Sequence, residues 1–127
     1  MKRNKYHARA VIMGKLKFAS RAEAARYLIL ADQQRRGEIR NLAMQVKYDL
    51  PAGITYRADF AYDRTGPDRT QDGVPIWYRV VEDVKGFETA AFRLKRRLWE
   101  DRYNMPLTIV RMRSKDVNVL LRAAGIV

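Results

Sequence analysis

Residues 54–86 decide the fold and read ITYRADFAYDRTGPDRTQDGVPIWYRVVEDVKG. Both ends of this stretch alternate in the way of half-buried strands, and residues 65–73 between them are dense in turn formers. We therefore predict a hairpin of two strands, 54–63 and 75–85. Alternation along the first strand puts Tyr56, Ala58, Phe60 and Tyr62 on one face and Asp59 on the other face.

Helices and further strands are indicated on both sides of this hairpin. Ser20 and Glu23 form a capping-box pattern ahead of an amphipathic helix that ends near Gly37. A strand over 43–50 follows it, and a short hairpin around Gly14 precedes it.

After Gly86, a second amphipathic helix is predicted from about Glu88 to Tyr103, with its apolar face formed by Phe87, Ala91, Leu94 and Leu98. A strand over 107–112 and a short helix from Ser114 follow. From the first helix onward the order is α-β-β-β-α-β-α, which predicts one α/β domain over 1–127 with a mixed central sheet.

The composition points to a polyanionic partner. The chain has 127 residues and carries 26 Lys and Arg against 14 Asp and Glu, a net charge of +12. A surplus of this size favours binding to nucleic acid. Residues 1–9 are expected to form a basic arm. No apolar run approaches the ~18 residues of a membrane span, so we predict no membrane association and a cytoplasmic location.

The residue types exclude several chemistries. There is no cysteine, and His7 is the single histidine. Thiolate zinc sites, cysteine nucleophiles and two-histidine metal sites are therefore excluded, and a Ser-His-Asp triad is disfavoured. Catalysis would depend on carboxylates, lysine and a hard metal ion.

The hairpin brings two aspartates together. If its turn is centred at residue 71, Asp59 lies opposite Asp83, because their numbers sum to 142. Like charges across a strand pair are destabilising unless a cation lies between them. Two carboxylates suit Mg²⁺, with Lys85 on the face of Asp83, where it could act on the attacking water. The alternative is a solvated hairpin whose Asp and Lys side chains form ordinary ion pairs.

Asp59 followed by Asp83-Val84-Lys85 resembles the PD-(D/E)xK nuclease signature. A wider set of residues resembles a group of small phage proteins classed with these nucleases, over about residues 5–112: Phe18–Glu23, Gly37–Ile39, Gln45, Ala58–Phe60 and Glu82–Gly86. The resemblance implies a restriction-endonuclease-like fold and Mg²⁺-dependent phosphodiester hydrolysis, with Mn²⁺ as a substitute. If the chain is phage-encoded, its location is the host cytoplasm.

The resemblance also suggests roles for other positions. Glu23 is either a third carboxylate ligand or only the partner of Ser20 in the capping box. Gln45 is similar to a glutamine near the active site of such nucleases. Ala58 stands where proline is common in this superfamily. Glu82 is an alternative to Asp83 as the acid of the second motif, and we prefer Asp83 because it shares a face with Lys85.

The functional prediction is a Mg²⁺-dependent DNA endonuclease, similar to phage Holliday junction resolvases and acting on branched DNA. Cutting a junction would require two active sites and therefore a homodimer. Candidate nucleic-acid contacts are Gln45 and the second-helix cations Arg93, Lys95 and Arg96, and three aromatic residues could stack on bases: Trp77, Tyr78 and Trp99. The alternative function is a basic nucleic-acid-binding protein without catalysis.

Overall fold

The structure, a computed structural model, describes residues 9–126. In chain order its elements are β1 (Val11–Met13), β2 (Leu16–Phe18), α1 (Arg21–Arg35), β3 (Ile39–Asp49), the 3₁₀ turn η1 (Pro51–Gly53), β4 (Thr55–Arg69), β5 (Pro75–Val84), α2 (Ala90–Tyr103), β6 (Thr108–Val110) and α3 (Ser114–Ala123). From α1 onward this confirms the predicted order of helices and strands. The predicted arm, His7 included, lies outside the described residues except for Arg9.

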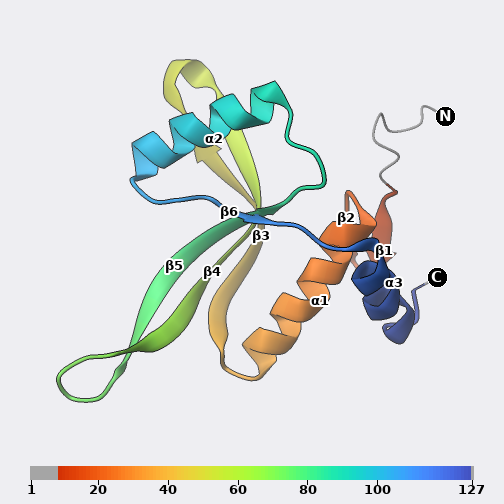
Figure 1. The fold of residues 1–127 in the computed structure, drawn as a ribbon, viewed down its shortest axis with the longest axis horizontal. Helices are drawn as coiled ribbons and strands as arrows, with labels where there is room; N and C mark the ends of the chain where they lie inside the picture. Colours follow the sequence, from red (N-terminus) through yellow and green to blue (C-terminus); the bar gives the residue numbers. More distant parts are fainter. Residues whose placement is uncertain (1–8, 127) are drawn as a thin grey trace.

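The central sheet is mixed, as predicted. Its strand order is β3-β4-β5-β6, and β1 and β2 form a small separate hairpin (Figure 1). Neighbouring strands from β3 to β5 are antiparallel, whereas β6 runs parallel to β5. Helix α2 makes the connection from β5 to β6, as a parallel pair requires.

The register of the central hairpin near the site is the predicted one, although the chain turns over 70–74 and the shift between Thr65 and Arg69 sets that register. Phe60 pairs with Glu82 and Ala61 with Val81, so the paired numbers sum to 142. Asp59 and Asp83 come next on the two strands, and the Asp59 N–H donates to Asp83 Oδ1. The pairing therefore places the two aspartates side by side at the end of β5.

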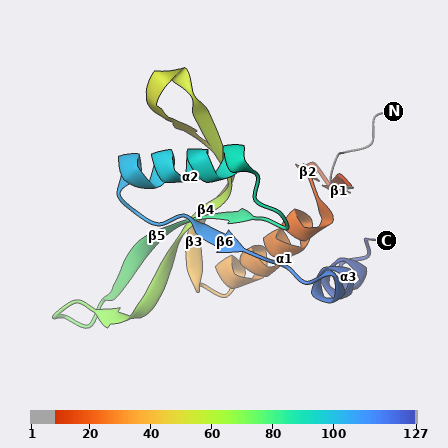
Figure 2. The same ribbon diagram turned by 45° about the horizontal axis from the view of Figure 1, so that its top comes forward.

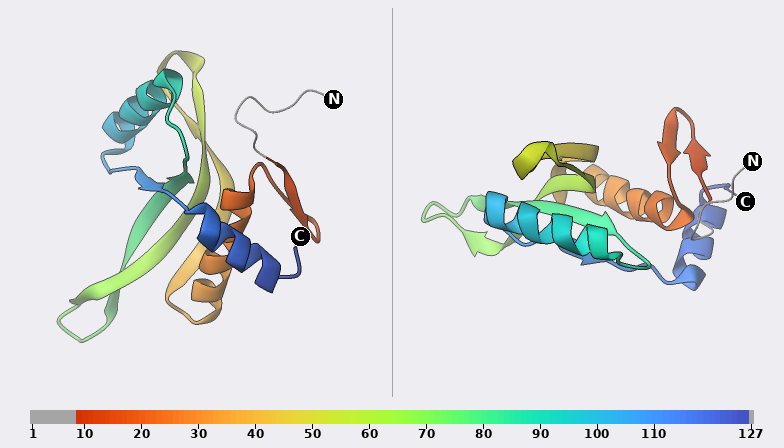
Figure 3. Two further views of the ribbon diagram at one scale, coloured as in Figure 1. Left: turned by 45° about the vertical axis from the view of Figure 1, so that its right-hand side comes forward. Right: turned by 90° about the horizontal axis from the view of Figure 1, so that it is seen from above.

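Helices cover both faces of the sheet (Figures 2 and 3). One core cluster joins α1 and α3 to Phe60 and Tyr62, and the other joins α2 to Tyr56 and Ala58. All four of these β4 residues are buried, but they do not share one core as the alternation predicted. The change falls at one point, between Ala58 and Phe60, where the neighbouring strand β3 has Gln45 with a φ of +53°, so the alternation is interrupted there.

The face of α2 that packs on the sheet differs from the predicted one. Phe92 and Trp99 are buried, whereas Phe87 and Leu94 are 66% and 57% exposed. The Trp99 ring contacts Tyr48, with 5.5 Å between ring centroids. Two large aromatic side chains seven residues apart bury more apolar area than Ala91 and Leu94 would, so they determine which side of the helix faces the sheet.

The hairpin strands extend further than the turn residues suggested. β4 continues to Arg69, through most of the stretch predicted as a turn, and the chain reverses over 70–74. The register shifts between Thr65 and Arg69, which accommodates Gly66 and Pro67 as an irregularity within the strand. β3 likewise begins four residues before the predicted start, at Ile39.

Within residues 9–126, none of the helices has both the length and the apolar character needed to cross a membrane.

Candidate active site

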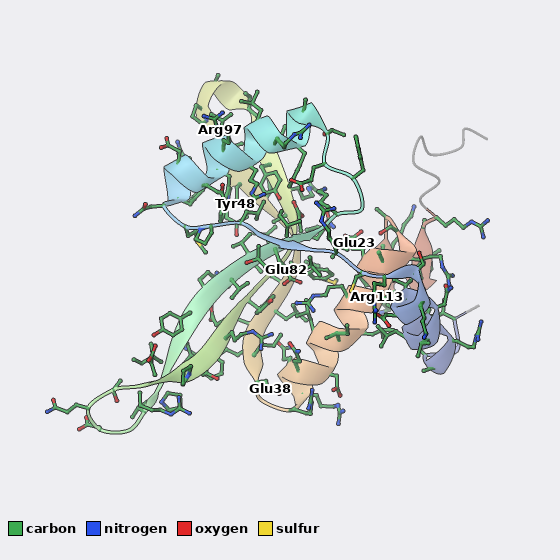
Figure 4. The ribbon with its side chains drawn as sticks, viewed as in Figure 1. Glu23, Glu38, Tyr48, Glu82, Arg97 and Arg113 are labelled. Carbon is green, nitrogen blue, oxygen red and sulfur yellow. The ribbon has the colours of Figure 1, made fainter. Side chains whose placement is uncertain are left out.

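Three acidic side chains come together from three different elements. Glu23 lies in the first turn of α1, Asp59 on β4 and Asp83 near the end of β5. Figure 4 labels Glu23 close to the place where α1 meets the sheet. The hairpin register pairs the two aspartates, whereas the contact with Glu23 arises from the packing of α1.

Glu23 takes part both in the helix cap and in the acidic cluster. Ser20 Oγ accepts a hydrogen bond from the Glu23 backbone N–H at 3.1 Å, as the capping pattern predicted. The Glu23 carboxylate does not return to Ser20: its Oε2 accepts from the N–H of Ala19, at 3.1 Å. Its other oxygen is left to face Gln45, so the cap occupies only half of the carboxylate.

Gln45 joins Glu23 to Asp59. Its Nε2 donates to Glu23 Oε1 at 2.5 Å and to Asp59 Oδ1 at 3.3 Å. The backbone of Gln45 has φ of +53°, a conformation that non-glycine residues rarely adopt within a strand. Backbone of this kind persists where the surroundings require it, and it is concentrated at functional sites.

The two aspartates are held by backbone groups. The Asp59 N–H donates to Asp83 Oδ1 at 2.8 Å, and the Val84 N–H donates to Asp59 Oδ2 at 2.9 Å. Asp83 is 1% exposed, and its Oδ2 is buried without a hydrogen-bond partner. A buried carboxylate oxygen with no donor carries the full desolvation penalty, which is uncommon in a folded protein.

Burial also changes the protonation of this cluster. It raises the pKa of Glu23 from 4.5 to about 7, and the nearby negative charge of Asp59 adds to that shift. Burial raises the pKa of Asp83 to about 6, although the Asp59 N–H and the charge of Lys85 both oppose the change. Clustered acids with raised pKa values are typical of sites that bind a cation or move protons.

Lys85 follows directly after β5, beside Asp83. Its backbone N–H donates to Val110 at 3.0 Å, and its Nζ lies 4.5 Å from the centroid of the Phe92 ring. The side chain therefore extends toward α2 with its charge over an aromatic face. Its electrostatic effect on Asp83 shows that the two charges are close enough to interact.

Glu82, the alternative acid, is held in a different environment. It is fully buried and accepts bonds from Arg26 at 2.7 and 3.0 Å and from the Tyr62 hydroxyl at 2.7 Å. Both of its oxygens are occupied by these donors. This arrangement favours Asp83 as the acid of the second motif. No sequence pattern marked Arg26 as its partner.

The oxygen donors fit a hard cation such as Mg²⁺, although the cluster is not arranged as a finished binding site. In the described part of the chain, no three acidic or histidine side chains stand in positions that would hold a metal ion. The Gln45 amide already lies between Glu23 and Asp59. Mg²⁺ needs only one or two protein carboxylates, and Asp83 Oδ2 offers a free acceptor.

The predicted nucleic-acid contacts on α2 are not equivalent. Arg96 is half-buried and pairs with Glu88 at 3.7 Å and Glu100 at 3.5 Å, so its charge is largely neutralised within the fold. Arg93 is exposed and Lys95 is half-buried, and neither forms an ion pair inside residues 9–126.

The three aromatic residues also differ. Trp99 is fully buried in the core, which is the usual place of an aromatic residue at helix spacing, so it is not available to stack on bases. The Trp77 ring is covered by the Arg40 guanidinium at 4.1 Å. Tyr78 is exposed and donates its hydroxyl to Asp68.

Comparison with known proteins identifies a family. Residues 3–116 match the family described as Protein of unknown function (DUF1064). The chain belongs to this family. No curated protein and no solved structure matches the chain.

Proposed function

We propose that this protein is a Mg²⁺-dependent DNA endonuclease that acts in the cytoplasm on branched DNA. The observation that carries the proposal is the convergence of Glu23, Asp59 and Asp83, in which the buried Asp83 keeps an unpartnered oxygen beside Lys85. Such a cluster is costly to a fold unless it binds something. The chain as a whole has a net charge of +12, so a cation bound at this acidic cluster would sit on a protein that attracts phosphate groups.

In this proposal Asp59 and Asp83 hold the metal, and Glu23 either binds it directly or orients its water. Bound Mg²⁺ lowers the pKa of water and neutralises charge on the phosphate. Lys85 contributes a positive charge at the end of β5, where it stabilises the negative charge that develops during phosphodiester hydrolysis. Gln45 orients the Glu23 and Asp59 carboxylates by donating hydrogen bonds to both.

The raised pKa of Glu23, about 7, allows it to hold or release a proton near neutrality. Binding of a cation beside Glu23 would favour its ionised form and lower this pKa, so metal binding and proton release are linked. The backbone bonds at Asp59 and Asp83 keep the acids in place before any ligand arrives, which reduces the reorganisation that catalysis would need.

A second function has an observation in its favour. Because the Gln45 amide fills the space between Glu23 and Asp59, the same cluster can be read as a site closed by hydrogen bonds. The protein would then bind nucleic acid through its basic surface without cutting it.

A cleavage assay separates the two functions. Linear, flapped and four-way-junction DNA would be incubated with Mg²⁺, Mn²⁺ or EDTA. We expect cleavage with either metal and none in EDTA, and a loss of cleavage in Asp83→Asn. Asp63→Asn is the matched control, since Asp63 lies on β4 and binds Asn41 outside the cluster. Binding to all three DNAs without any cleavage would support the second function instead.

A further inference from the structure

A groove of about 580 Å³ lies next to the acidic cluster, between the first turns of α1 and α3 and the segment that joins β5 to α2. Ser20, Val84 and Lys85 line it, and they are the residues that connect it to the cluster. Ser20 caps the helix that carries Glu23, and the Val84 N–H holds Asp59. The volume falls within the ~300–1,000 Å³ that is usual for sites of small ligands.

The groove has a cationic side and an apolar side. Arg21 and Lys85 line it, and none of the described lining residues is acidic. The apolar part is formed by Phe87, Phe92 and Met112. Charge of one sign beside an aromatic surface is complementary to a ligand that has an anionic group at one end and a flat ring at the other.

The polar groups around the groove strengthen this charge. The N-terminal ends of three helices lie there: Ser20 and Thr89 are the N-cap residues of α1 and α2, and Ser114 is the first residue of α3. The first turn of α3 has no side-chain cap, so its backbone N–H groups are available to an acceptor. These helix ends add to a potential that the two cationic side chains already make positive.

We propose that this groove binds an unpaired nucleotide of the DNA strand, next to the phosphate that the acidic cluster would act on. Arg21 and Lys85 bind the nucleotide's phosphate, and its base lies on Phe87. This inference rests on the proposed function, because it places the groove next to a scissile phosphate.

A blunt duplex does not have the same complementarity. Duplex DNA exposes its phosphates but keeps its bases stacked inside the helix. It can therefore bring a phosphate to Arg21 and Lys85 without offering a base face to Phe87. Stacking on aromatic side chains is the usual way in which proteins bind unpaired bases. The expected substrate is DNA with a flap, a gap or a single-stranded end.

The test compares the binding of a blunt fluorescein-labelled duplex with that of the same duplex carrying a short unpaired extension. Fluorescence anisotropy is measured with the full chain, in EDTA and at one salt concentration. We expect the extension to increase affinity about fivefold or more, the lower end of what one base stacked on an aromatic ring contributes.

Substitutions at Phe87 locate the effect. Phe87→Ala should bring the affinity for the extended DNA down to that for the blunt duplex. Phe87→Leu keeps much of the apolar volume without the aromatic face and should lose most of the gain. Leu94→Ala is the matched control, since Leu94 is similarly exposed but does not line the groove, and it should retain the gain.

Two results would overturn the proposal: equal affinity of the wild-type chain for both DNAs, or the same loss in Leu94→Ala as in Phe87→Ala. Cleavage of the same DNAs in Mg²⁺ tests the nuclease function separately. If the protein cleaves DNA but binds both DNAs with equal affinity, the groove is not a nucleotide site, and the nuclease function still stands. If the extension increases affinity but no DNA is cleaved, the nuclease function is wrong, and the groove is still a DNA-binding site.

Discussion

Adjacent acids on β5 lie in opposite environments. Glu82 and Asp83 are both almost completely buried, but Glu82 accepts hydrogen bonds from Arg26 and Tyr62 on both oxygens. Asp83 has a backbone donor on one oxygen and none on the other, and its pKa is raised to about 6. Burial is therefore common to a structural acid and a candidate functional acid. The difference lies in whether the surrounding donors compensate for it.

The comparison separates two regions of the molecule. In the region of Glu82, a fully hydrogen-bonded ion pair fastens α1 to the sheet. In the region of Asp83, three acids are held together with fewer donors than they can use. Destabilising the first should impair folding, and neutralising the second should impair function. The four predictions that follow, from the largest effect to the smallest, test this division.

The largest effect is expected from Arg26→Met. Removal of the guanidinium leaves Glu82 buried without its charge partner, which typically costs about 3–5 kcal/mol. The free energy of unfolding would be measured with urea, followed by circular dichroism. The double variant Arg26→Met/Glu82→Met should recover much of the loss, because no unpaired charge remains. A loss below about 1 kcal/mol in Arg26→Met would show that the ion pair does not hold α1 to the sheet.

Asp83→Asn and Lys85→Ala are expected to impair cleavage. Asp83 would hold the metal, and substitution of a ligand should cost more than the roughly 10–100-fold that an outer-shell partner does. Asp59→Asn should match Asp83→Asn. DNA binding, measured by anisotropy in EDTA, should stay near the wild-type value in Asp59→Asn and Asp83→Asn, since neither aspartate would bind a phosphate directly. Cleavage by Asp83→Asn at the wild-type rate would remove Asp83 from the site.

The pH dependence of stability tests Glu23. Its pKa is higher in the folded chain, about 7 against 4.5, so the folded state binds the proton more tightly. Wild-type stability should fall as pH rises from about 4.5 to 7, and level off above that. Glu23→Gln resembles the protonated form, so it should equal wild type at acidic pH and exceed it above pH 7, by on the order of 1–3 kcal/mol.

Thermal unfolding between pH 4 and 8 checks this expectation. Cleavage should decrease sharply in Glu23→Gln, since a neutral amide is a poorer Mg²⁺ ligand than a carboxylate. If the variant follows the wild-type pH curve, Glu23 is not the group that titrates. If it cleaves at the wild-type rate, the residue acts only as part of the helix cap.

Asp63→Asn should have the smallest effect. Its ion pairs with Arg40 and Arg79 are long, 3.7 and 3.4 Å, and both arginines are about half exposed. Such pairs contribute about 0–1 kcal/mol. Cleavage and stability should both remain near wild type. A large loss of cleavage in Asp63→Asn would show that the site extends along β4, beyond the region of Asp83.

The candidate site was largely predictable, because most of it depends on local patterns. Alternation located Asp59 and Asp83 on the two strands of one hairpin, and the capping pattern located Glu23 at the start of a helix. The environments of these residues were not predictable. The bond between Arg26 and Glu82 joins residues 56 positions apart. Local sequence patterns span only a few residues, so they cannot predict such a contact.

The packing of α2 shows the same limit in the fold. Its existence and approximate ends followed from periodicity, but the choice of buried face did not. A helix with apolar residues on several sides can present more than one face to a sheet. The buried face is the one with Phe92 and Trp99, because Tyr56 and Tyr48 on the sheet lie in contact with these two rings.

The sequence by itself determined the order of the elements and the mixed α/β class, and it placed Asp59 and Asp83 on the two strands of one hairpin. These follow from periodicity, turn chemistry and charge, which act over a few residues. Tertiary structure alone decided that Glu82 is compensated and Asp83 is not, that Gln45 lies between two carboxylates, and that a cationic groove adjoins them. Each of these environments depends on side chains that are distant in the sequence. Only the folded chain brings these side chains close enough to supply hydrogen bonds and to exclude water.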